Sequence, residues 1–255
     1  GLVVDYYAPR LSLETETQLG ESFSESFSHE LEAEQQRKQA YLQGLMDQLV
    51  KEKYGKAPHL NYQVHLDPDP TANAFAFPGG HIVVMEGLVD QASSENELIF
   101  VLGHEMGHLH HRHNLRAIGR GLALYVMTEA IFGGGSGLSK NVGAFTQSFQ
   151  QGFSRAQELE ADHTGLEALY GHYHHVGGVM DFLSRHEQEV GFTGTSLGQY
   201  FSSHPHPQGR MERLNGIIQS KGWSQGEKQA LPDFSAAASG ASEPSDKASG
   251  QNHKE

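Results

Sequence analysis

One stretch, residues 94–111, constrains the fold of this chain more than any other. The five consecutive apolar residues Leu98–Leu102 indicate a helix that is buried on most sides. Ser94, followed three residues later by Glu97, forms a capping-box pattern and predicts that the helix begins there. We therefore expect the rest of the chain to pack around this helix.

The polar residues of this helix follow the pattern H-E-x-x-H. His104 and His108 are four residues apart, share one helical face, and can offer imidazole nitrogens to a single metal ion. Glu105 lies one step round the helix, where it can take a proton from water at that ion. Gly103 and Gly107 each weaken a helix by about 1 kcal/mol relative to alanine, so we expect them to permit close approach of another backbone. Because the chain has 17 histidines, the pattern needs support from its context.

Composition narrows the possible partners and ligands. The 255-residue chain is long enough for one domain with a substantial core. Its 31 acidic and 18 basic residues give a formal charge of −13, which argues against nucleic acid or an anionic membrane as the main partner. Cysteine is absent, so disulfides and thiolate ligands are excluded and a transition metal must be bound through nitrogen and oxygen.

Neither a leader nor a membrane span is predicted. The chain opens with Gly1–Asp5 and no basic region, unlike a signal peptide. The longest apolar candidate, Leu115–Phe132, contains Arg116, Arg120 and Glu129 and is too polar to cross a bilayer alone. We expect a protein without a transmembrane segment, from which any leader has been removed.

Short strands precede the H-E-x-x-H helix directly. Ala74–Phe77 and His81–Met85 flank the turn Pro78–Gly80, and the alternation in Asn61–Asp67 predicts a third strand. The hairpin has two interpretations. It can offer an exposed edge to an extended peptide, or it can simply close the core.

Outside this region the chain is predicted to be helical between two polar ends. Apolar residues recur at helical spacing in five further segments: about 30–54, 116–132, 145–165, 179–190 and 211–218. We expect a polar, loosely ordered arm over 1–28, a domain over 29–222 and a disordered, low-complexity tail over 223–255. The glycine run 133–137 is interpreted as a flexible connection in preference to a hinge.

A catalytic zinc site takes three protein ligands, so the two histidines require a third residue. The segment 158–162 offers Glu158, Glu160 and Asp162. Glu158 and Asp162 share a helical face, whereas Glu160 lies about 200° round from Glu158, so the spacing leaves the choice of face open. With Glu158 on the ion, Asp162 would lie nearby as an acceptor for a ligand imidazole N–H.

Four segments of the chain resemble metallopeptidase family forty-eight, which includes the HtpX heat-shock proteases, the CAAX prenyl proteases and the periplasmic BepA group. They are H-E-M-G-H at 104–108, Ser154–Asp162, Asn73–Gly80 and the loop Ser203–Arg210. The loop matches the BepA branch best. The resemblance covers roughly residues 30–221.

The resemblance implies a fold and a set of site residues. The fold would be α+β and mainly α-helical: a zincin-like metallopeptidase domain with a small β-sheet along the active-site cleft. Glu158 would be the third zinc ligand beside the two histidines of the helix, and Glu105 the general base. His204 and Arg210 would lie at the substrate pocket, and one or the other would donate to the developing oxyanion.

We therefore predict a zinc-dependent endopeptidase, with one zinc ion per chain, that hydrolyses unfolded or misfolded proteins. An extended substrate would pair with the hairpin edge, at Asn73, Ala74, Phe75 and Ala76. The match to a periplasmic branch predicts a periplasmic or membrane-peripheral location and partners in envelope assembly. The alternative is a zinc-containing chaperone or adaptor, which would have no use for a general base at Glu105.

The remaining histidines are interpreted separately. His204 either donates to the oxyanion or coordinates zinc in a resting state and blocks the enzyme, and Pro205 and Pro207 restrict the backbone around it. Two clusters are expected to have no dedicated role at the metal: His110, His111 and His113, and His172, His174 and His175.

Overall fold

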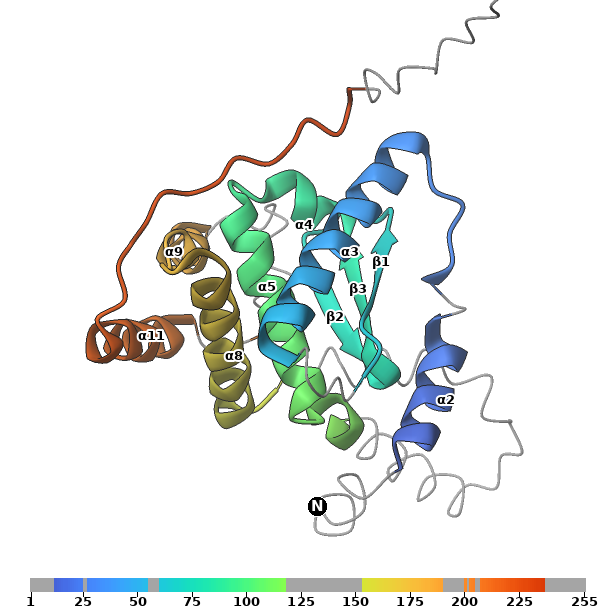
Figure 1. Ribbon diagram of the computed structural model, residues 1–255, viewed down its shortest axis with the longest axis horizontal. Coiled ribbons are helices and arrows are strands. Elements are labelled where there is room, and N and C mark those ends of the chain that lie inside the picture. Colours follow the sequence, from blue (N-terminus) through green and yellow to red (C-terminus); the bar gives the residue numbers. More distant parts are fainter. Residues whose placement is uncertain are drawn as a thin grey trace, which may run out of the picture.

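The chain folds as helices around a small three-stranded sheet (Figure 1). The computed structural model describes residues 12–24, 27–54, 60–117, 153–189, 200, 202–204 and 207–236. The helices are α2 (Leu13–Ser24), α3 (Ala33–Tyr54), α4 (Glu86–Gln91), α5 (Glu95–His110), α8 (Arg155–Tyr173), α9 (Val179–Glu189) and α11 (Pro207–Lys221). The strands are β1 (Gln63–Asp67), β2 (Ala74–Phe77) and β3 (His81–Met85), with the turn η3 (Pro78–Gly80) between β2 and β3. The predicted fold class, α+β and mainly helical, is confirmed.

β3 is the central strand of the sheet. It pairs in parallel with β1 and antiparallel with β2, its predicted hairpin partner. The outer edge of β1 is covered by α3, because the Val64 and Leu66 N–H groups donate to Gln43 Oε1 at 2.8 Å and Gln39 Oε1 at 2.9 Å. The opposite edge belongs to β2, which lies next to α5.

α5 and α8 lie side by side (Figure 1), and at several glycine positions they are so close that a Cβ would clash with the other helix. A Cβ on Gly107 would lie 2.8 Å from Ala161 Cα, and a Cβ on Gly103 would lie 3.0 Å from Gly165 Cα. A Cβ on Gly165 would lie 2.7 Å from the Phe100 carbonyl oxygen. The close approach predicted for Gly103 and Gly107 is confirmed, and it brings the acidic residues of α8 to the histidines of α5.

Gly107→Ala is expected to lower the free energy of unfolding by about 1–3 kcal/mol, because overpacking this contact pushes the two helices apart. Gly44→Ala in α3 is the matched control, since nothing lies within 4 Å of its added Cβ. Its higher helix propensity should stabilise the protein by up to about 1 kcal/mol. Denaturant unfolding measures both changes, and a stabilised Gly107→Ala variant would contradict the tight contact.

The described part of the segment predicted as a loose arm over 1–28 is mostly helical. Residues 13–24 form α2, which packs on the η3 turn. A Cβ on Gly20 would lie only 2.0 Å from the Pro78 carbonyl oxygen. Glu16 is fully buried and forms an ion pair with Arg112 at 2.6 Å. These contacts join residues far apart in the sequence, so the polar composition of the segment did not reveal them.

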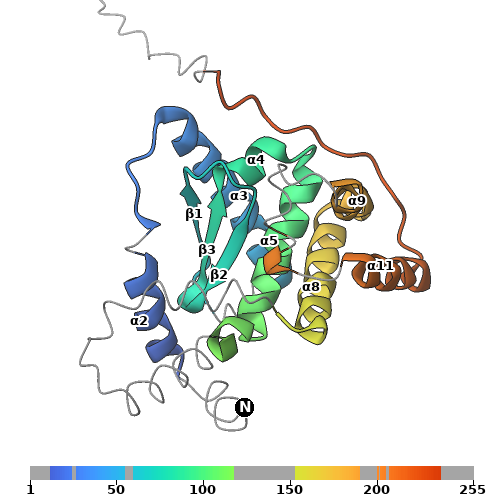
Figure 2. The same cartoon turned by 180° about the vertical axis from the view of Figure 1, so that it is seen from behind.

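The C-terminal segment 223–236 has no helix or strand and runs from α11 along the outside of the domain (Figure 2). It packs on the domain, whereas a disordered tail was predicted. Trp223 stacks on Tyr170 of α8 with ring centroids 4.3 Å apart. Further along, the carbonyl of Gln229 accepts a hydrogen bond from the Glu95 N–H at the start of α5, at 2.9 Å. A few anchoring residues thus order a stretch whose overall composition is typical of disorder.

Several predicted segments lie outside the described residues. They are most of the helix over 116–132, the glycine run 133–137, the first part of the helix over 145–165, Pro205 and the tail after residue 236. Of the helices that the structure does describe, none combines the length and apolar composition needed to cross a membrane.

Candidate metal centre

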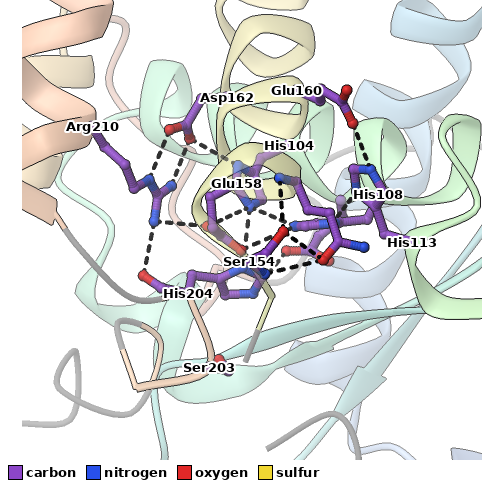
Figure 3. A network of polar contacts seen from close by, with 12 residues as sticks. His104, His108, His113, Ser154, Glu158, Glu160, Asp162, Ser203, His204 and Arg210 are labelled. Carbon is purple, nitrogen blue, oxygen red and sulfur yellow. Dashed lines mark hydrogen bonds and ion pairs between the residues drawn. The ribbon is translucent and has the colours of Figure 1, made fainter. Parts of the chain in front are cut away.

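Four buried side chains converge where α5 and α8 meet. His104 and His108 come from α5, Glu158 from α8, and His204 from the segment before α11. Their ligand atoms all lie within 4.8 Å of one another (Figure 3). Nε2 of His104 is 3.0 Å from Nε2 of His108 and 3.1 Å from Nδ1 of His204. Nitrogen and carboxylate oxygen atoms that face one another in this way suit a divalent transition metal.

Buried polar atoms around this group point to the same conclusion. Glu105 is only 1% exposed, yet neither of its carboxylate oxygens makes a hydrogen bond to the described residues. Its Oε1 has an ion-pair neighbour, His204 Nε2, at 3.4 Å. Oε2 of Glu158 and Nε2 of His204 also lack a hydrogen bond to the described residues and have only ion-pair neighbours there: Arg210 and His104 for Glu158, and Glu105 for His204. Such atoms are costly to bury unless an ion or ordered water completes them. The residues present therefore fit a metal ion, with the Glu105 carboxylate beside it.

The position of Glu158 depends on how α8 begins. The helix predicted to continue from Phe153 begins instead at Arg155. Ser154 caps it: the Ser154 hydroxyl accepts from the Gln157 N–H, and the Gln157 side chain accepts from the Ser154 N–H. Glu158 therefore lies in the first turn of α8, where it is fully buried.

The acidic residues of α8 point in different directions (Figure 3). Glu158 faces the histidines, with Oε2 3.6 Å from His104 Nε2 and Oε1 3.5 Å from His108 Nε2. Asp162 lies behind His104, with its Oδ1 3.0 Å from the His104 Nδ1. Glu160 points elsewhere, and its side chain is half exposed. The sequence spacing had left open which face of α8 turns to the metal. In the structure, the face with Glu158 and Asp162 lies against His104 and His108.

Arg210 lies behind the group, and its predicted donation to an oxyanion does not fit this position. Its Nε and Nη2 donate to the two oxygens of Asp162 at 2.7 and 2.6 Å. Its Nη1 donates to the His204 carbonyl oxygen at 2.9 Å and lies 3.1 Å from Glu158 Oε2. Burial alone would raise the pKa of Asp162, but the Arg210 charge holds that pKa below its usual value. Each nitrogen of Arg210 already faces a protein acceptor, so Arg210 holds the site together.

Burial and neighbouring positive charges act in opposite directions on the pKa values of the two glutamates at the centre, Glu158 and Glu105. Burial alone would raise the pKa of Glu158, but the charge of His204 and hydrogen bonds from His108 and His204 hold it well below its usual value. For Glu105 burial prevails and raises the pKa to about 7. A bound cation would add positive charge and lower the pKa of Glu105, which favours the ionised carboxylate.

The strand predicted to bind substrate lies next to this group. The Asn73 carbonyl, just before β2, accepts from the Met85 N–H of β3 at 2.9 Å. Strand alternation then directs the backbone of Phe75 towards β3 and turns that of Ala74 and Ala76 away from it. The polar backbone groups of Ala74 and Ala76 therefore face the outer side of the sheet, where α5 lies. The Ala76 carbonyl there accepts a hydrogen bond from Asn114 Nδ2 at 3.2 Å.

Asn73 connects this edge to the segment that carries His204. Its Oδ1 accepts from the Ala74 N–H at 2.9 Å and lies 3.2 Å from the Ser203 hydroxyl, whose one proton can also go to the Tyr200 carbonyl at 2.9 Å. Asn73 is 1% exposed and Ser203 is 5% exposed, so the contact is internal. The side chain of Asn73 thus positions the strand edge and the His204 segment relative to each other.

Three residues contact the site although the sequence did not predict this role for them. Phe153 stacks on His108 with ring centroids 3.9 Å apart, and Tyr200 stacks on His204 at 4.6 Å. Neither belongs to a motif, so their positions follow only from the fold. His113, expected to have no role at the metal, is fully buried, and its Nδ1 lies 2.9 Å from the Nδ1 of His108. Its place shortly after the second motif histidine was the only indication in the sequence.

Comparison with known proteins agrees with this geometry. The sequence profile of peptidase family M48 matches residues 36–218. Mitochondrial metalloendopeptidase OMA1 of Schizosaccharomyces pombe is 30% identical over 159 residues, which cover 61% of this chain and 46% of that protein. Metalloprotease LoiP of Escherichia coli is 33% identical over 119 residues, 43% of this chain and 44% of that protein. A candidate beta-barrel assembly-enhancing protease of Vibrio cholerae is 27% identical over 154 residues, 56% of this chain and 32% of that protein.

The match extends across both helices of the site. It includes α5 with its H-E-x-x-H pattern, α8 with Glu158, and the segment of His204. The chain spans less than half the length of each of the three relatives. The family resemblance of the sequence is confirmed: the chain belongs to peptidase family M48, and its matched core is a metallopeptidase domain of that family.

Proposed function

We propose that this chain is a zinc-dependent endopeptidase whose catalytic domain spans residues 29–222. Two imidazoles and one carboxylate are a typical ligand set of catalytic zinc. The observation that carries the proposal is Glu105, a buried carboxylate outside the ligand group whose Oε1 lies 3.4 Å from His204 Nε2. A site built only to hold a metal has no need of such a group.

Zinc held by His104, His108 and Glu158 would supply Lewis acidity, which polarises a carbonyl and makes water more acidic. Glu105 would serve as the general base and general acid. Its carboxylate accepts the proton of the attacking water and passes it to the leaving amine. Arg210 and Asp162 hold the His104 ring from behind during this exchange.

The proposed substrates are unfolded polypeptides. An extended chain could pair with the outward backbone of Ala74 and Ala76 if it displaces the side chains that now bond there, Asn114 at the Ala76 carbonyl and Asn73 at the Ala74 N–H. Pairing through the main chain depends little on the sequence of the substrate. A folded protein offers few free extended segments. Selectivity would therefore depend on the conformation of the substrate more than on its residues.

Cleavage of one protein in two states tests this function. The native form of a small disulfide-bonded protein and its reduced, alkylated form share one sequence and differ in conformation. We expect rapid, chelator-sensitive cleavage of the unfolded form and little cleavage of the native one. Equal rates for the two forms would contradict docking at the strand edge, and no cleavage of either would contradict the endopeptidase activity.

His204 has two proposed roles, and its place in the ligand group supports the resting one. Its Nδ1 lies 3.1 Å from His104 Nε2 and 3.2 Å from Glu158 Oε1, as a fourth metal ligand would. A neutral nitrogen there would close a tetrahedral site and keep water away. In the active state the same side chain would donate to the oxyanion.

His204→Ala separates these roles. An increased rate of cleavage with unchanged zinc content is expected if His204 blocks the metal, and a decreased rate with unchanged zinc is expected if it is mainly a donor. The measurement is the steady-state rate on an unfolded substrate, together with the metal content of both proteins. An unchanged rate would exclude both roles.

The four-residue ligand group also supports a second candidate, a zinc-containing chaperone or adaptor. Structural zinc sites are closed by four protein ligands, and His204 could complete such a site. Glu105 argues against this candidate, because a closed site does not use a general base. Glu105→Gln distinguishes the two candidates, because only the endopeptidase would lose its activity.

The proposed location is periplasmic or membrane-peripheral, with partners in envelope assembly. The name of the Vibrio cholerae relative, which refers to β-barrel assembly, supports this proposal. OMA1 relatives carry names that refer to mitochondria, so family membership by itself does not determine the compartment.

A further inference from the structure

The ring nitrogen of His108 that faces away from the ligand group has a partner of its own. His108 Nε2 faces the group, whereas its Nδ1 lies 2.9 Å from Nδ1 of His113. His113 is fully buried just after α5. Its other nitrogen, Nε2, lies 2.9 Å from Oε2 of Glu160 (Figure 3). A continuous path of polar contacts therefore runs from the ligand group through His113 to the half-exposed side chain of Glu160.

These contacts permit one arrangement of protons when His108 binds a metal. If His108 offers the Nε2 lone pair, its proton lies on Nδ1 and is donated to His113. His113 then accepts at Nδ1, carries its own proton on Nε2, and donates it to the Glu160 carboxylate. In this path His108 donates, His113 accepts once and donates once, and Glu160 is the final acceptor.

The same helix supports the other motif histidine in a parallel way. His104 Nδ1 lies 3.0 Å from Asp162, which Arg210 holds in turn. The segment 158–162 of α8 would therefore supply one ligand, Glu158, and an anchor for each of the two histidines. Asp162 anchors His104 directly, and Glu160 anchors His108 through His113.

We propose that His113, held by Glu160, is a positioning residue for the metal: it fixes the orientation and the tautomer of the His108 ring. This inference rests on the proposed metal site. Groups that hold metal ligands from behind typically change metal affinity about 10–100-fold when they are removed. The effect of Glu160 should be smaller than that of His113, because its exposed side chain can be replaced by water.

The test measures the zinc affinity of the full chain by competition with a chromophoric chelator, together with the visible spectrum of the cobalt(II) form. His113→Ala is expected to weaken zinc binding about 10–100-fold and to shift the cobalt spectrum. His113→Gln keeps an acceptor and a donor, so it should recover most of the affinity. Glu160→Ala should weaken binding less than His113→Ala. His163→Ala is the control, because this histidine of α8 is exposed, and it should bind zinc like the unaltered chain.

Two results would overturn the proposal. One is unchanged affinity and an unchanged cobalt spectrum in both His113→Ala and Glu160→Ala. The other is an equal loss in His113→Gln and His113→Ala, which would assign the effect to packing. If the unaltered chain binds no zinc, the metal site itself fails. If it binds zinc and the variants bind equally well, only this inference fails. Glu160→Ala alters a half-exposed residue, so it stays decisive even if His113→Ala does not fold.

Discussion

Glu105→Gln is expected to lower the rate of peptide hydrolysis about 10²–10⁴-fold, the usual contribution of a general acid–base group. Glutamine has nearly the shape of glutamate, but its amide does not accept a proton near neutral pH. Glu105 is not one of the four residues of the ligand group, so the substitution removes no ligand. The variant should therefore keep its metal and its fold. The measurements are kcat/KM on an unfolded substrate, metal content and the unfolding midpoint.

Glu167→Gln is the matched control for this variant. Glu167 is a partly exposed carboxylate on α8, and its substitution should leave hydrolysis unchanged. Undiminished cleavage by Glu105→Gln would remove Glu105 from the mechanism and favour the chaperone or adaptor. Loss of metal along with activity would instead make Glu105 a ligand.

Glu158→Gln is expected to weaken metal binding by more than about 100-fold, beyond the range of groups that only support ligands. The substitution takes the negative charge out of a group whose other members are histidines. Glu160→Gln, two residues along the same helix, should leave metal binding nearly unchanged. Its amide oxygen can still accept the hydrogen bond from His113. Metal content after dialysis against a weak chelator measures both effects.

The comparison is sensitive to the orientation of α8. Both variants remove one charge from the same turn of one helix, so general effects on the helix or on net charge should be similar. If Glu160→Gln loses the metal and Glu158→Gln keeps it, the ligand has been assigned to the wrong face. Loss in both would indicate that the metal depends on the whole segment.

The sequence predicted the parts of the site that obey local periodicity. His104 and His108 lie on one face because four residues nearly complete a helical turn. The close contact of α5 with α8 was predicted for a similar reason, since glycine in a helix is costly unless a neighbour requires it. For Glu158 the periodicity gave two faces, and only the packing of α8 on α5 selects between them.

What the sequence did not predict depends on contacts between distant residues. Arg210 carries the right charge for an oxyanion donor, but the fold places Asp162 against it, and two of its nitrogens donate to that carboxylate. The polar composition of residues 13–24 and 223–236 suggested disorder, yet both segments are ordered by contacts with the core. Glu16 pairs with Arg112, and Trp223 stacks on Tyr170.

The central claim is that this chain hydrolyses peptide bonds with a single metal ion held by α5 and α8. Native mass spectrometry of the purified chain, combined with casein cleavage before and after chelation, tests it most directly. We predict one zinc ion per chain, loss of cleavage when the zinc is removed, and recovery when one equivalent is restored. Several weakly held ions per chain, or cleavage that persists after complete removal of metal, would contradict the claim.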